Sequence, residues 1–238
     1  MIVVSFGVRK SGSTLAFEMA KAVLELSGFP QEMLPDGVVE PDRKINIVRT
    51  WTDVRLARLL EATTGKKIVV KTHGSPDRLS VGSLLGAIES RDLQIQVVYR
   101  DPRDAVLSML DHGARSRENS RPNLRQIVDV DDAIEALGPD VASLRRWGAF
   151  ESLKLQYGRF AFDRVEGPRA MADALGVEVD PDEVWERLDG RPTKKNVARP
   201  NRHTTEMSPA DAARIAAAFP DYLGLVEHDD HGWFCSTA

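Results

Sequence analysis

The chain has 238 residues, of which 42% are hydrophobic and 29% are charged, and this length and balance suit a globular protein with one sizeable core. These proportions exclude a disordered chain, a collagen-like repeat and a fibrous protein. The 36 Asp and Glu residues outnumber the 32 Lys and Arg residues, giving a net charge of −4, so we expect no nucleic-acid partner and only local anion-binding sites.

The first predicted unit is a strand, a polar loop and a helix. Ile2–Phe6 (IVVSF) is a continuous apolar run rich in β-branched residues, typical of a strand buried on both faces. Gly7–Gly12 (GVRKSG) is polar and has a glycine at each end. Ser13–Leu26 has helix-forming residues with apolar side chains at helical spacing, and Gly28 and Pro30 end the pattern.

The same order of elements occurs twice more. A strand predicted at Lys67–Lys71 precedes a polar loop and a helix at about Leu79–Ile88. A strand predicted at Gln94–Tyr99 precedes a loop and a helix at Arg103–Gly113. Apolar strands that alternate with helices predict an α/β fold with three layers, in which a mostly parallel central sheet is flanked by helices on both faces.

The remainder of the chain is predicted to be mainly helical. A fourth strand is predicted at Leu153–Tyr157, and Ile45–Val48 is a weaker strand candidate. The predicted helices beyond Pro168 are Arg169–Leu175, Asp182–Leu188 and Pro209–Phe219. Ala114–Asp132 is polar, contains arginines and has no clear periodicity, so it is either a surface loop or a cover over a site. Without a linker or an internal repeat, residues 1–238 are expected to form a single domain.

Neither a targeting signal nor a membrane span is predicted. The start of the chain lacks the charged front and long apolar region of a cleavable signal, and no apolar run approaches the ~18 residues that suggest a span. The single cysteine, Cys235, excludes an intrachain disulfide and a zinc cluster built from several cysteines. We therefore expect a soluble, cytoplasmic protein.

Gly7–Thr14 (GVRKSGST) has the glycine spacing of a phosphate-binding loop. Backbone amides in such a turn and at a helix N-terminus converge on an oxyanion, while Lys10 adds mobile positive charge. Gly12 permits close approach of an anion, and Ser13 and Thr14 add hydroxyl groups. The alternative is a plain strand-to-helix turn in which Ser13 is the N-cap and Lys10 is solvated.

Further polar side chains follow the second and third predicted strands. Lys71 and His73 lie at the end of one strand, and Arg100 and Ser108 follow the other. Open α/β sheets bind ligands at the carboxyl ends of their strands. A histidine can take a proton from a hydroxyl group, and an arginine fork suits a phosphate. The alternative makes these residues surface, capping or packing residues.

Taken together, these segments resemble the PAPS-dependent sulfotransferases, where PAPS is 3′-phosphoadenosine 5′-phosphosulfate. The resemblance rests on KSGST at 10–14, KTH at 71–73 and YRDPRDAVLS at 99–108, in this order on successive strands, and covers roughly residues 1–175. It implies a P-loop-like sulfotransferase fold. It also implies transfer of a sulfuryl group to a hydroxyl, or an amine, of a small-molecule or glycan acceptor.

The resemblance assigns a role to each matched residue. The residues implied to bind PAPS, or its product PAP, are Lys10, Ser11, Gly12, Ser13, Thr14, Arg100, Ser108 and Tyr157. Lys10 is expected on the bridging oxygen of the leaving group, and Arg100 and Ser108 on the 3′-phosphate. His73 matches the general base, and Lys71 is expected to stabilise the transferring group. Tyr157 matches a tyrosine near the adenine.

The sequence departs from the family pattern in three places. Leu15 stands where an aromatic residue often stacks on the adenine, and no dimerisation motif is recognisable, which leaves the oligomeric state open. The usual segment that closes over the 3′-phosphate is replaced by Arg191–His203 (RPTKKNVARPNRH), with five Lys and Arg and no Asp or Glu. We expect Arg202 to take the closing role, and the alternative is a solvated basic loop.

Sulfuryl transfer, like phosphoryl transfer, is expected to depend on positioning and charge stabilisation, without a metal. A P-loop kinase or NTPase is the alternative enzyme, but it needs magnesium and a lysine where Ser13 stands, and neither Asp53 nor Asp101 suits its metal-binding strand end. A noncatalytic PAPS-binding protein is the other alternative, although it would not need His73.

Overall fold

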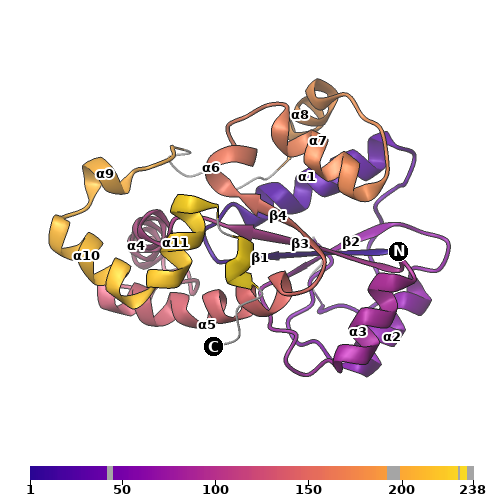
Figure 1. The fold of residues 1–238 in the computed structure, drawn as a ribbon, viewed down its shortest axis with the longest axis horizontal. Helices are drawn as coiled ribbons and strands as arrows, with labels where there is room; N and C mark the ends of the chain where they lie inside the picture. Colours follow the sequence, from indigo (N-terminus) through magenta and orange to yellow (C-terminus); the bar gives the residue numbers. More distant parts are fainter. Residues whose placement is uncertain (42–44, 192–198, 230, 235–238) are drawn as a thin grey trace.

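The computed structural model describes residues 1–41, 45–191, 199–229 and 231–234 (Figure 1). The strands are β1 Ile2–Gly7, β2 Ile68–Thr72, β3 Leu93–Tyr99 and β4 Ser152–Gln156. The helices are α1 Ser13–Leu26, α2 Asp53–Ala62, α3 Val81–Glu89, α4 Pro102–Glu118, α5 Val130–Gly148, α6 Tyr157–Phe160, α7 Glu166–Leu175, α8 Pro181–Asp189, α9 His203–Glu206, α10 Pro209–Ala218, α11 Pro220–His228 and the 3₁₀ helix η1 His231–Phe234.

The four strands form one sheet in the order β2-β1-β3-β4, and every pair is parallel. Val4 of β1 lies opposite Val70 on one side and Ile95 on the other. All four carboxyl ends therefore lie at the same edge of the sheet, as predicted. The candidate strand at Ile45–Val48 is wrong, because a single bridge joins Ile47 to Lys71 before the chain turns away into α2.

Helices cover both faces of the sheet, which confirms the predicted three-layer α/β architecture. Successive side chains of β1 point to opposite faces: Val3 packs in a core with α1, α7 and α8, whereas Ile2 and Val4 pack in the core with α2, α3 and α5. Figure 1 shows these two helical layers above and below the strands. Both cores contain fully buried residues, such as Val4 in one and Ala20 in the other.

Several elements differ from the sequence prediction. α4 continues to Glu118 and α5 begins at Val130, so both ends of the polar stretch 114–132 are helical and only residues 119–129 form a loop. α5 was not predicted, because Gly138 and Pro139 interrupt its apolar pattern. Its start is fixed by a capping box, in which Asp129 and Asp132 each accept a hydrogen bond from the other's backbone amide. α2 and α11 were not predicted either.

Some predicted features lie outside the described residues. They are positions 192–198 of the basic C-terminal segment and Cys235. In the part of the chain that is described, no helix combines the length and the apolar character needed to cross a membrane.

Candidate active site

The phosphate-type loop joins β1 to α1 at the carboxyl edge of the sheet. Gly12 is the N-cap of α1 with φ 85°, no described side chain caps the helix, and its first turn contains no acidic residue. Ser13 is therefore not the N-cap, contrary to the alternative of a turn capped by Ser13. Lys10 also has a left-handed backbone, with φ 68°, a strain typical of functional loops. The N-terminal amides of α1 can donate hydrogen bonds to an anion.

Close packing explains the two glycines of this loop. A Cβ atom on Gly7 would lie 2.3 Å from the Cβ of Ser13, and one on Gly12 would lie 2.4 Å from Cδ2 of Tyr157. Ser11 is fully buried, and its hydroxyl donates to the carbonyl of Val8 at 2.6 Å. The Ser11 amide donates to the same carbonyl at 3.1 Å. Ser11 thus holds the loop together, while its predicted contact with PAPS stays a prediction.

Two lysines predicted from the sequence lie beside the loop. Lys71, at the end of β2, donates through Nζ to Oγ1 of Thr14 at 2.7 Å. Nζ of Lys10 lies 3.4 Å from Nδ1 of His112, which α4 presents to the loop. Lys71 is buried and Lys10 is half-buried. Positive charge from two different strand ends therefore gathers at the N-terminus of α1.

His73 is half-buried two residues after Lys71, with Nδ1 2.6 Å from the carbonyl oxygen of Gly7. A carbonyl can only accept a hydrogen bond, so Nδ1 carries the proton and Nε2 keeps its lone pair. Burial, and then the positive charge of Lys71, lower the pKa of His73 to about 4, while Asp140 acts in the opposite direction. His73 is therefore neutral at pH 7 and able to accept a proton at Nε2.

An ion pair that sequence reasoning missed fastens the loop to α5. The backbone amide and Nε of Arg9 both donate to Oδ2 of Asp140, each at 2.8 Å, and Nη2 of Arg9 donates to the carbonyl of Ala136. Asp140 is buried. The partners are 131 residues apart in the chain, so only the fold reveals the pair. It holds the backbone immediately before the strained Lys10.

Arg100 directly follows β3, which ends at Tyr99, and its side chain is buried. Its Nη2 donates to Oδ2 of Asp104 at 3.0 Å, and its guanidinium carbon lies 4.5 Å from the centre of the Tyr157 ring. Its Nη1 lies 3.5 Å from the carbonyl of Lys10, which brings it next to the phosphate-type loop. Its Nε has no hydrogen-bond partner among the described residues. A buried donor of this kind costs about 1–3 kcal/mol unless a ligand satisfies it.

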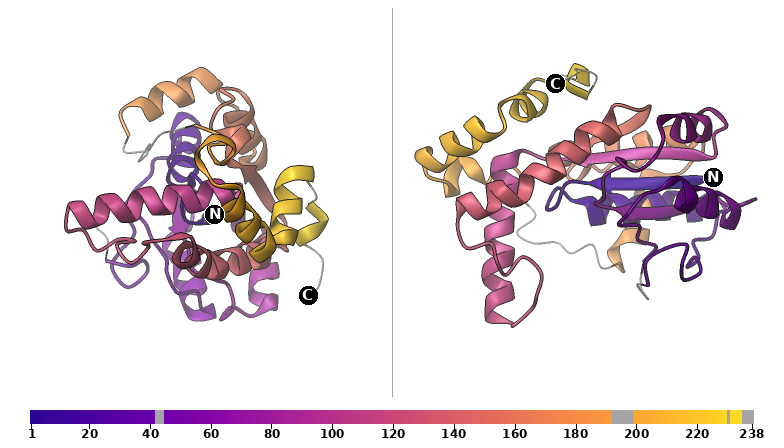
Figure 2. Two further views of the ribbon diagram at one scale, coloured as in Figure 1. Left: turned by 90° about the vertical axis from the view of Figure 1, so that its left-hand side faces the viewer. Right: turned by 90° about the horizontal axis from the view of Figure 1, so that it is seen from below.

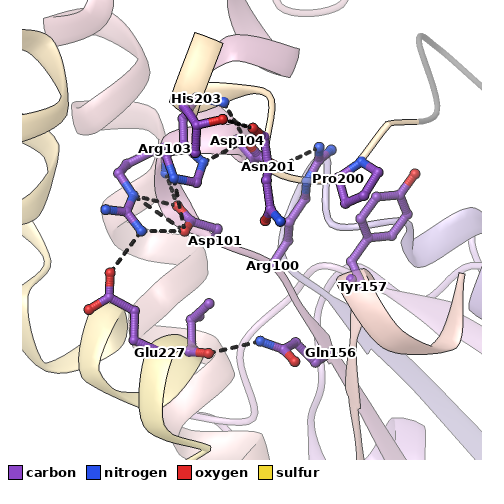
Figure 3. A pocket seen from close by; sticks show the side chains of 13 residues that line it. Arg100, Asp101, Arg103, Asp104, Gln156, Tyr157, Pro200, Asn201, His203 and Glu227 are labelled. Atoms are coloured by element: carbon purple, nitrogen blue, oxygen red, sulfur yellow. Dashed lines mark hydrogen bonds and ion pairs between the residues drawn. The ribbon is translucent and has the colours of Figure 1, made fainter. Parts of the chain in front are cut away.

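A pocket of about 280 Å³ opens beside Arg100 (Figure 3). Its lining residues come from the starts of α4, α6 and α9 and from α11: Arg100, Asp101, Arg103, Asp104, Gln156, Tyr157, Gly158, Pro200, Asn201, His203, Thr204, Val226 and Glu227. Oδ1 of Asp104 accepts from both the amide and Nδ1 of His203, each at 2.9 Å. Burial raises the pKa of Asp104, but Arg100 and these bonds outweigh it and lower the pKa below its usual value.

Ser108 lies on α4 between the two halves of the site. Asp104, Ser108 and His112 are spaced by four residues and so share one face of the helix. Asp104 contacts Arg100 at one end of this face, and His112 contacts Lys10 at the other. Ser108 itself is buried, and its placement agrees with the predicted phosphate role without testing it.

Arg202 lies near the pocket but is not among the residues that line it. Its Nη1 donates to Asp111 at 2.8 Å, and its Nε and Nη2 donate to Glu206 at 3.0 and 2.6 Å. These bonds raise its pKa further above the usual value. The residue of the basic segment that lines the pocket and bonds to Asp104 is His203. The sequence offered no signal for His203 other than its place in that segment.

Neither a protein-family model nor a curated protein sequence matches the chain. Solved structures do resemble it. Retinol dehydratase in complex with retinol and PAP superposes with a TM-score of 0.57, over 95% of this chain and 82% of that one. The same enzyme with androsterone and PAP gives 0.56 over 95% and 81%. Mouse sulfotransferase SULT7A1 with PAP gives 0.57 over 93% and 83%. Sequence identity is 15% in each case, so the likeness is one of fold.

Proposed function

From its sulfotransferase fold and the groups at the carboxyl edge of its sheet, we propose that this protein transfers the sulfuryl group of PAPS to an acceptor hydroxyl. The acceptor is a small molecule or a glycan. The similar structures were solved with PAP, two of them also with retinol or androsterone, which supports the same nucleotide and a small-molecule acceptor here.

One observation carries the proposal: two groups of hydrogen-bond donors that suit an anion lie side by side. The uncapped N-terminus of α1 with Lys10 is one, and Arg100 with its unsatisfied buried Nε is the other. Nη1 of Arg100 lies 3.5 Å from the carbonyl of Lys10, so the two positions adjoin. PAPS has phosphates on both the 3′ and the 5′ oxygens of one ribose, and it fits such a pair of positions. Ser108 is proposed to assist Arg100, and Tyr157 to lie near the base.

PAPS supplies the sulfuryl group, and its bond from sulfur to the 5′-phosphate oxygen breaks as the bond from sulfur to the acceptor oxygen forms. His73 accepts the acceptor's hydroxyl proton at Nε2, because Nδ1 is already held by Gly7. Lys10 stabilises the charge on the departing phosphate oxygen, and Lys71 stabilises the sulfuryl oxygens. The chain's own cations and amides thus provide the positive field of an in-line transfer.

The two alternatives predict different behaviour. A kinase or NTPase would turn over ATP with magnesium, whereas sulfuryl transfer by this site is expected to persist in excess chelator, since Lys10, Lys71 and Arg100 supply the positive charge. A noncatalytic PAPS-binding protein would bind PAP equally well with or without His73 and would transfer nothing. Transfer from sulfur-labelled PAPS into a metabolite extract, with EDTA present, distinguishes the sulfotransferase from both alternatives, and magnesium-dependent ATP turnover distinguishes the two alternatives from each other.

The donor assignment is tested by comparing PAP with adenosine 5′-phosphate, which lacks only the 3′-phosphate. PAP at micromolar concentration is expected to raise the melting temperature more. Arg100→Ala should erase the difference, because a charged hydrogen bond of this kind contributes roughly tenfold to a hundredfold in affinity. Arg169→Ala, an exposed position on α7, should leave it unchanged. Equal shifts with both nucleotides in the unaltered protein would remove the role of Arg100.

A further inference from the structure

The far half of α4 and the segment that returns from it form a projecting arm, which we define as residues 113–128. Figure 2 shows it standing out from the body on the side where the strands end. It begins immediately after His112, whose Nδ1 lies 3.4 Å from Nζ of Lys10. The arm therefore starts at the phosphate-type loop and extends outward from it.

Internal contacts give the arm a defined shape. A Cβ atom on Gly113 would lie 2.4 Å from the carbonyl oxygen of Ile127, so helix and return segment are in direct contact. Nη1 of Arg117 donates to the carbonyls of Arg125 and Ile127, at 3.1 and 2.6 Å. Ile127 is buried in the main core. These contacts fix the backbone of the arm, and so they fix the positions from which its exposed side chains extend.

The arm is basic in a protein whose net charge is −4. It contains four arginines and one acidic residue, Glu118. Most arginines elsewhere pair with a carboxylate, as Arg9, Arg55 and Arg103 do. Within the arm, Arg117, Arg121 and Arg125 are all exposed. Among the described residues, no carboxylate forms an ion pair with any of these three.

We propose, building on the function proposed above, that the arm binds negatively charged groups of the acceptor. At a rise of about 1.5 Å per residue, Arg115 and Arg117 lie roughly 5 to 8 Å along the axis beyond His112. The acceptor class is thus a hydroxylated molecule with carboxylate, sulfate or phosphate groups that reach about 5 to 9 Å along α4 beyond His112. Residues 113–128 contain no aromatic side chain, which disfavours a nucleic acid, because single strands are bound largely by stacking.

The test uses two matched probes and the PAP-saturated protein in a calorimetric titration at low salt. One probe is a hexasaccharide of alternating glucuronate and N-acetylglucosamine, and the other is the neutral N-acetylglucosamine hexasaccharide. We expect at least about tenfold tighter binding of the acidic probe. R121Q/R125Q should weaken that binding by roughly fivefold to thirtyfold, as two exposed charges would. R58Q/R169Q, which removes two exposed arginines on α2 and α7, should change it by less than about twofold.

The affinity for PAP should be the same in all three proteins, because the arm variants do not alter the nucleotide site. Equal affinity for the two probes, no binding of the acidic one, or an equal loss in R58Q/R169Q would overturn the inference. Tighter binding of an RNA with the same number of charges would overturn it too. If PAP binds but the acidic probe does not, only this inference fails; if PAP itself does not bind, the proposed function fails.

Discussion

At the scale of single residues, His73 is the position where chemistry and binding can be separated. Its Nδ1 is held by Gly7, while Arg100 and the phosphate-type loop hold the nucleotide in the proposed function. His73→Ala is therefore expected to lower turnover by roughly 10² to 10⁴, the effect of losing a positioned base. The dissociation constant of the His73→Ala protein for PAP should stay within a few fold of that of the unaltered protein. Labelled-PAPS transfer and PAP titration measure the two quantities.

A control for this substitution is His228→Ala, at an exposed position on α11, which should leave turnover unchanged. Folded His73→Ala protein that transferred sulfate at the normal rate would show that His73 is not the base. The acceptor would then be acidic enough to lose its proton without help.

The pH dependence of turnover gives a second prediction for His73. Since burial and Lys71 lower its pKa to about 4, turnover should be flat from neutral pH to about pH 5 and fall below that. Asp140→Asn removes a charge that raises this pKa, so the acid limb should move to lower pH. Lys71→Met should move it to higher pH. A pH–rate profile with the same acid limb in all three proteins would assign the limb to another group.

The same pKa shift affects stability. Between about pH 6.5, the ordinary pKa of histidine, and about pH 4, the unfolded chain binds a proton at His73 that the folded chain does not. The free energy of unfolding should therefore decrease as the pH falls through this range.

At the scale of the elements, the turn from β1 into α1 depends on Gly12. Gly12→Ala would place a methyl group 2.4 Å from the Tyr157 ring at φ 85°, so we expect a loss of stability and a weaker affinity for PAP. Gly28→Ala is the matched control, because Gly28 has φ 84° but a Cβ atom there would meet no atom of the described residues within 4 Å beyond its chain neighbours. It should cost only about 1–2 kcal/mol, the backbone penalty. Chemical denaturation and PAP titration compare the two, and equal losses would mean that the Tyr157 contact is unimportant.

The elements also show what the sequence could and could not predict. β1, β2 and β3 were predictable because they are buried on both faces and so form continuous apolar runs. α5 was not, because Gly138 and Pro139 interrupt it, while burial against the sheet and a capping box still make it helical. At the site, the loop residues, His73 and Arg100 follow predicted strands, so the parallel topology brought them to one edge. Asp140 and His203 were missed because their partners lie about a hundred residues away.

At the scale of the whole molecule, Tyr222 joins the C-terminal helices to the site. Its buried hydroxyl donates to the carbonyl of Arg100 at 2.7 Å and accepts from the Arg100 amide at 3.1 Å. Tyr222→Phe should cost about 2 kcal/mol, because two buried backbone groups lose their partner. For a chain of this length that lowers the melting temperature by about 4 to 8 °C. The affinity for PAP should fall as well, since Arg100 loses its support.

Tyr99→Phe serves as the comparison for Tyr222. The Tyr99 hydroxyl lies 3.4 Å from Asp229 and 3.3 Å from His231, both partly exposed groups that water can satisfy. Its loss should lower the melting temperature by less than about 4 °C. A Tyr222→Phe protein as stable as Tyr99→Phe would show that α11 does not support Arg100.

The position of β1 in the sheet has a consequence for synthesis on the ribosome. β1 is made first, yet it lies between β2 and β3, and α5, which covers one of its faces, ends at Gly148. At about 5 to 20 residues per second, the nascent chain needs roughly 7 to 30 s to complete these partners. Until β3 is made the apolar segment Ile2–Phe6 has an unpaired edge, and until α5 is made it has an uncovered face. Growing chains that end before Gly148 are therefore the species most prone to aggregate and most in need of a chaperone.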